Sequence, residues 1–81
     1  MDNRVELALN KLMQSGTLDL FDDELGQLTI VGKVEGLFSV DYWDHCQGQV
    51  ELAYSLEGVT ESKVRQWVQR WFRLLDKFDA I

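Results

Sequence analysis

The spacing of apolar residues changes twice along this chain, and that change limits the possible folds more than any other feature. Over residues 3–15, apolar residues recur at the three- and four-residue spacing of an amphipathic helix. Over residues 17–57 they alternate with polar residues, which is the pattern of strands that have one side in water. From residue 60 onwards the helical spacing returns. The sequence therefore predicts a helix, a set of antiparallel strands and a second helix.

The first helix is predicted over residues 3–15, and it carries a single apolar stripe. Asn3 is suited to cap its start, and Gly16 is suited to end it in the left-handed conformation. The stripe consists of Val5, Ala8, Leu9, Leu12 and Met13.

The last helix is predicted to run about 20 residues, because the chain contains no proline to interrupt it. Thr60 is suited to cap its start. Its apolar arc consists of Val64, Trp67, Val68, Trp71, Leu74, Leu75 and Phe78, and its opposite arc of Lys63, Gln66, Arg70, Arg73 and Lys77.

The middle of the chain predicts three or four strands joined by turns at residues 22–26, 34–36 and 44–48. Gly58 is expected to end the last strand. The predicted fold class is α+β: an N-terminal helix, a three- or four-stranded antiparallel β-meander and a long C-terminal helix. Both helices are expected on one face of the sheet, because nothing else in the chain can cover its apolar side.

The length of 81 residues predicts one small domain spanning residues 1–81. A domain of this size buries only about 60% of its unfolded surface, so its stability is marginal. Nine aromatic residues can supply the core, and a homodimer can supply it too. The single cysteine, Cys46, forms no intramolecular disulfide, and the N-terminus shows no signal-peptide pattern. We therefore expect a cytoplasmic protein.

The charge of the chain excludes several function classes. Eight basic residues against fourteen acidic ones give a net charge of −6 and a pI near 4.5. Contacts to nucleic-acid phosphates or anionic lipids need a basic surface, so we expect no direct nucleic-acid or membrane partner. The charge is also uneven, with −8 over residues 1–59 and +2 over residues 60–81. These values favour a protein partner with a basic surface.

No group of residues matches a catalytic or metal-binding pattern. His45 and Cys46 are adjacent, so in an extended chain they point to opposite sides and form no nucleophile–base pair. A zinc site needs about four ligands, and the chain has no second His or Cys. The acids at 22–24 are consecutive rather than alternating as in a calcium loop, and residues 26–33 lack the spacing of a phosphate loop. We predict no enzymatic activity and no cofactor.

The water-facing side of the strands provides the candidate binding surface. Asp41 and Trp43 should face away from the core, and Asp41 and Glu51 are expected to be cross-strand neighbours. Exposed aromatic residues ringed by charge are typical of protein-binding hot spots. The predicted partner-binding residues are Leu37, Asp41, Trp43, Glu51 and Glu57. A second candidate patch on the last helix consists of Arg70, Phe72 and Arg73.

Two classes of function are consistent with these features. The first is a non-enzymatic acidic module that inhibits a basic, nucleic-acid-handling protein. In its small size, acidity and lack of catalytic groups the chain resembles phage-encoded inhibitors of host defence or transcription. The second is a dimeric chaperone or adaptor that holds a client polypeptide, because the helix–sheet–helix order and acidic pI are similar to type III secretion chaperones. Binding by an inhibitor should weaken steeply with salt, whereas client binding by a chaperone should not.

Overall fold

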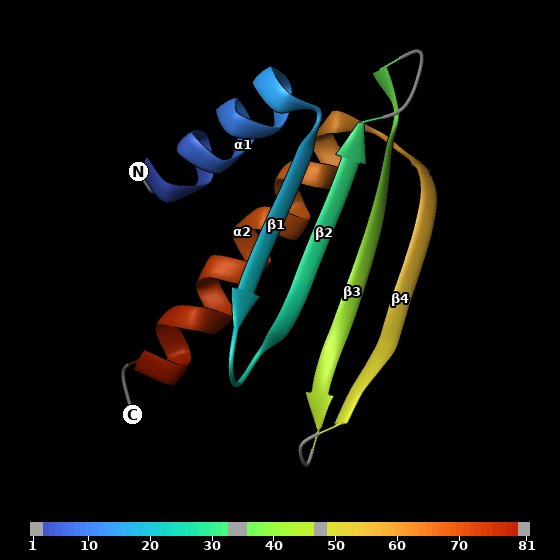
Figure 1. The fold of residues 1–81 in the computed structure, drawn as a ribbon. Coiled ribbons are helices and arrows are strands. Elements are labelled where there is room, and N and C mark those ends of the chain that lie inside the picture. Colours follow the sequence, from blue (N-terminus) through green and yellow to red (C-terminus); the bar gives the residue numbers. More distant parts are fainter. Residues whose placement is uncertain (1–2, 33–35, 47–48, 80–81) are drawn as a thin grey trace.

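The computed structural model describes residues 3–32, 36–46 and 49–79, and it has the element order helix, four strands, helix (Figure 1). The elements are α1 (Asn3–Ser15), β1 (Thr17–Asp22), β2 (Gly26–Gly32), β3 (Phe38–Cys46), β4 (Gln49–Val59) and α2 (Glu61–Asp79). The predicted α+β class is confirmed, and the number of strands is four.

The four strands form one antiparallel sheet in the order β1-β2-β3-β4, so each strand pairs with its neighbour in sequence. Both helices pack against the same face of this sheet, as predicted. In Figure 1, α1 lies beside the β1 edge and β4 forms the opposite edge. The other face of the sheet carries no helix from the described part of the chain.

The helix ends follow the predicted local signals. The amide of Gly16, whose φ is 81°, donates to the carbonyl of Leu12 at 2.8 Å and so completes the last turn of α1. The hydroxyl of Thr60 accepts the amide of Lys63 at 3.4 Å, which caps α2. The first contact satisfies a carbonyl at the C-terminal end of α1, and the second satisfies an amide at the N-terminal end of α2.

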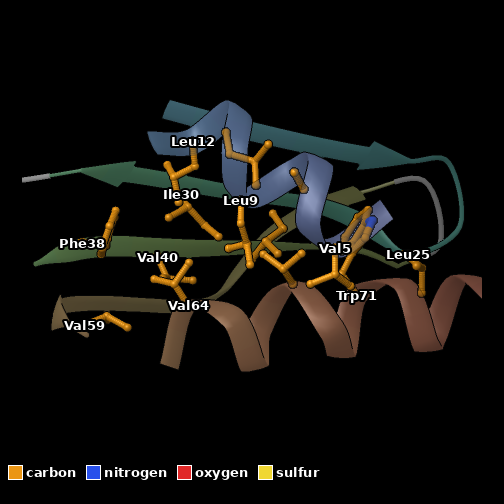
Figure 2. Packing of buried hydrophobic residues seen from close by; sticks show 14 residues of the cluster. Val5, Leu9, Leu12, Leu25, Ile30, Phe38, Val40, Val59, Val64 and Trp71 are labelled. Atoms are coloured by element: carbon orange, nitrogen blue, oxygen red, sulfur yellow. The ribbon is translucent and has the colours of Figure 1, made fainter. Parts of the chain in front are cut away.

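A single apolar cluster lies between the sheet and the two helices (Figure 2). Ile30 of β2, Val40 of β3 and Val64 of α2 have no exposed surface. The predicted stripe of α1 is buried except for Met13, which is 48% exposed. The full cluster consists of Val5, Ala8, Leu9, Leu12, Leu18, Leu25, Leu28, Ile30, Phe38, Val40, Val59, Val64, Val68 and Trp71.

Two ion pairs join α1 to α2 outside the apolar cluster. Arg4 pairs with Asp76 at 2.8 Å, and Glu6 pairs with Arg65. All four side chains are about half exposed, so each pair contributes at most about 1 kcal/mol. The two pairs therefore add little to the stability of the fold, most of which comes from the apolar cluster.

Strand β4 differs from the sequence prediction at two places. Gly58, expected to end the strand, lies inside it with φ of 65°, and Glu57 and Gly58 together stand opposite Ser39. A second extra residue, Ala53, lies between the pairs Tyr42–Tyr54 and Trp43–Leu52. Each such bulge reverses the side to which the following residues point. Alternation along β4 is therefore broken twice, although the sequence pattern looks continuous.

The turn expected at residues 44–48 is also shorter than predicted. Residues 44–46 continue β3 and pair with residues 49–51 of β4, while residues 47–48 lie outside the described part of the chain. Of the turn expected at residues 34–36, only Gly36 lies among the described residues.

Two leucines of α1 that differ in burial, Leu12 and Leu7, test the packing of this helix into the apolar cluster. Leu12 is 1% exposed and Leu7 is 68% exposed. Leu12→Ala should lower the free energy of unfolding by about 2–5 kcal/mol, because it leaves a cavity in the cluster. The same change at Leu7 should shift it by less than about 0.5 kcal/mol. Urea denaturation followed by circular dichroism measures both values, and equal losses would contradict this packing.

Candidate functional site

The helix-free face of the sheet, here called the open face, carries two rows of side chains that cross all four strands. Cross-strand partners in an antiparallel sheet share a face, so the register assigns the members of each row. The apolar row consists of Phe21, Gln27, Trp43 and Leu52, and the polar row of Asp19, Thr29, Asp41 and Ser55.

The apolar row presents large hydrophobic side chains to water. Phe21 at one edge is 61% exposed, Leu52 at the other edge is 48% exposed, and Trp43 between them is half-buried. Gln27 separates Phe21 from Trp43. Exposed apolar groups gathered in a strip of this kind mark interaction sites more often than single scattered ones do.

The polar row holds two carboxylates in fixed positions. The hydroxyl of Thr29 donates to Asp19 at 2.8 Å, and the hydroxyl of Ser55 donates to Asp41 at 2.7 Å. Each hydroxyl occupies one lone-pair direction of a carboxylate that has about four. The remaining directions are available to donors from a partner, such as lysine or arginine side chains.

Two local features of the backbone determine the strand pairing around Trp43 and Leu52. Gly26 starts β2 with φ of 115°, and a Cβ there would lie 1.9 Å from the Trp43 carbonyl oxygen, so only glycine permits this close pairing of β2 with β3. The bulge at Ala53 turns Leu52 away from the helices and places it opposite Trp43. Strict alternation with Val50, Tyr54 and Leu56 would instead put Leu52 on the core side.

The structure brings together some of the predicted binding residues and separates others. Asp41 and Trp43 lie in adjacent rows of the open face, as expected. Glu57 is exposed at the Gly58 bulge, and Leu37 is half-buried just before β3. Glu51 does not lie on the open face as expected: it pairs with Asp44, and both residues lie on the helix side of the sheet.

The expected Asp41–Glu51 pairing is therefore wrong, because β3 and β4 stay paired as far as Cys46 and Gln49, which puts Glu51 opposite Asp44 and Ser55 opposite Asp41. Phe21, Leu52 and Asp19 are the open-face residues that the sequence reasoning missed. Because Leu18 and Leu20 face the core, strict alternation along β1 would have placed Asp19 and Phe21 on the open face. Nothing in the local sequence indicates the bulge that exposes Leu52.

The second predicted patch does not form one surface. Phe72 is half-buried, and the guanidinium of Arg4 from α1 lies 4.9 Å from its ring centre. Arg70 is exposed on another side of α2, with its guanidinium 5.9 Å from the ring centre of Trp67. Arg73 is exposed near Arg70. Phe72 thus belongs to the α1–α2 contact, while the two arginines lie elsewhere on the helix.

On the helix side, four aromatic residues cluster between α2 and the end of β3. The ring centres of Tyr42, Tyr54 and Trp67 lie 5.7–6.4 Å from one another. The ring centre of Trp71 lies 6.3 Å from that of Tyr42. The Tyr42 hydroxyl donates to the Leu25 carbonyl at 2.8 Å. Burial raises the pKa of the Tyr42 phenol, the Asp44 carboxylate raises it further, and Arg70 opposes this shift.

Among residues 3–32, 36–46 and 49–79, no three His, Cys, Asp or Glu side chains come together in a way that could hold a metal ion. Neither described helix is long and apolar enough to cross a membrane. Comparison of the chain with protein-family models, with curated proteins and with solved structures finds no match. The geometry of the two sheet faces is therefore the basis for any functional inference.

The raised pKa of Tyr42 predicts how stability depends on alkaline pH. The folded chain keeps the phenol proton to a higher pH than the unfolded chain, whose value is near 10.0, so this contribution is complete below that pH and is lost as the pH rises above it. Tyr42→Phe should remove this part of the alkaline loss, and should cost about 0.5–1.5 kcal/mol at neutral pH through the lost hydrogen bond.

Urea denaturation at about pH 8 and about pH 11 measures this dependence, since the two values bracket an ordinary tyrosine pKa. Tyr54→Phe is the matched control, because Tyr54 is 52% exposed on the neighbouring strand. An unchanged alkaline loss in Tyr42→Phe would show that other groups cause it.

Proposed function

We propose that this protein is a non-enzymatic binding module whose open face binds the basic surface of another protein. The observation that carries the proposal is the apolar row Phe21–Trp43–Leu52 lying next to the carboxylates of Asp19 and Asp41. Aromatic anchors supply most of the binding energy at protein interfaces, and flanking charges select the partner and accelerate association.

Three further features support this function. Both helices lie on the opposite face of the sheet, so the open face needs no rearrangement to meet a partner. The strands hold the side chains on a hydrogen-bonded scaffold, which lowers the entropy lost on binding. The net charge of −6 attracts basic surfaces over distances of about 10 Å at moderate salt.

The proposed partner is a protein that normally binds nucleic acid, and the proposed effect is inhibition. A basic surface built for phosphates accepts carboxylates by the same charge-assisted hydrogen bonds. Asp19 and Asp41, each already held by one hydroxyl, would occupy such phosphate positions and block them. We also propose a cytoplasmic location, because a chain with one cysteine forms no intramolecular disulfide and so suits a reducing compartment.

Two open-face variants test the proposal. Asp19→Lys combined with Asp41→Lys, and Trp43→Ser alone, should each abolish capture of a specific basic protein from the native host's lysate. Loss of a central aromatic anchor typically weakens an interface about thirtyfold or more. Mass spectrometry of the retained proteins, eluted with a salt gradient, measures the effect.

Glu24→Lys is the matched control, because Glu24 is an exposed turn residue outside the open-face rows. The Glu24→Lys chain should capture the same protein as the wild-type chain does. Moderate salt should release that protein from the wild-type chain. Undiminished capture by the Asp19→Lys/Asp41→Lys chain would refute the role of the open face. Salt-resistant capture of apolar clients would favour the chaperone alternative.

A further inference from the structure

The helix side of β4 is only partly covered, in contrast to the other three strands. Tyr54 and Leu56 point to this side, because they pair with Tyr42 and Val40. They nevertheless remain 52% and 39% exposed, since α2 packs more closely against β3 than against β4. The sheet therefore has an apolar margin on the same side as its core.

A groove runs along this margin between α2 and β4. One part of it, with a volume of about 380 Å³, is lined by Tyr42, Tyr54 and Trp67 together with smaller apolar residues. A neighbouring part is lined by Leu56 and again by Trp67. Tyr54 and Trp67 meet edge to face at 5.7 Å, which holds the floor of the groove in a fixed shape.

The two walls of the groove carry opposite charge. On the α2 wall, Lys63 and Arg70 line the groove. On the strand wall, Asp44 lines it, and Glu51 is the direct cross-strand partner of Asp44 on the same face. Within the described part of the chain, none of these four residues forms an ion pair. Their charges are available to an occupant.

This arrangement is complementary to itself. A second copy rotated by 180° about an axis along the groove would set its α2 wall over the strand wall of the first copy. Arg70 of each copy would then face Asp44 of the other, because both residues line the same part of the groove, and Tyr54 and Leu56 would meet their own counterparts. Rotation about an axis across the groove would instead oppose like charges.

We propose that the groove between α2 and β4 is a homodimer interface and that its occupant is a second copy of this chain. A stable interface removes about 800 Å² from each partner, roughly a seventh of the 5641 Å² surface of this chain. An 81-residue domain gains most from such burial, because its own core is small. The open face points away from this interface and stays accessible in both copies.

Charge reversal on one wall at a time tests the proposal. The first variant is Lys63→Glu with Arg70→Glu, and the second is Asp44→Lys with Glu51→Lys. Each makes both walls of the groove alike in sign, so its self-association should weaken by about a hundredfold or more. All four residues are exposed, so both variants should keep the wild-type circular dichroism spectrum.

Mixing the two variants supplies the decisive measurement. In an equimolar mixture every positive wall can face a negative one, so a heterodimer should form although each variant alone is monomeric. Sedimentation equilibrium of the wild-type chain, each variant and the mixture measures the masses, with Lys11→Glu on α1 as a charge-reversal control that should remain dimeric.

The proposal would be overturned if the wild-type chain stayed monomeric at about 100 μM, because its self-association would then be too weak for a stable interface. Double variants that remain dimeric, or a mixture that does not associate, would also overturn it. These experiments use this chain alone, and none of the substituted residues lies on the open face. Their failure would therefore say nothing against binding of a basic partner by the open face.

Discussion

Burial of one sheet face against two helices is the constraint on which the rest of this structure depends. The apolar cluster draws on α1, on α2 and on the inward residues of the strands, and it closes only if both helices lie on the same side. The described part of the chain contains no further element to cover the second face. An exposed face with an ordered backbone is therefore a direct consequence of how this small core is made.

The same constraint determines the character of each face. On the open face, hydroxyl groups hold the carboxylates of Asp19 and Asp41 beside a strip of aromatic and aliphatic side chains. On the helix side, α2 is too narrow to cover all four strands, and β4 keeps Tyr54 and Leu56 exposed. The proposed partner-binding face and the proposed dimer groove thus lie on opposite sides of one sheet and do not compete.

The two bulges in β4 connect these surfaces. The residue inserted at Ala53 moves Leu52 to the open face and Glu51 to the helix side. It thereby completes the apolar row and adds a second carboxylate to the strand wall of the groove. Without it, simple alternation from Tyr54 would turn Leu52 toward the helices and Glu51 toward the open face.

The sequence by itself determined the two helices, their caps at Gly16 and Thr60, the single buried face of β1 to β3 and the placement of Asp41 and Trp43 on the open face. These features depend on periodicity and on contacts a few residues apart, which a single chain segment encodes. The tertiary structure alone decided the register of β4, the side on which Glu51 and Leu52 lie, and the groove beside α2. These features depend on how strands and helices far apart in sequence fit together, and the bulge at Ala53 has no glycine to mark it in the sequence.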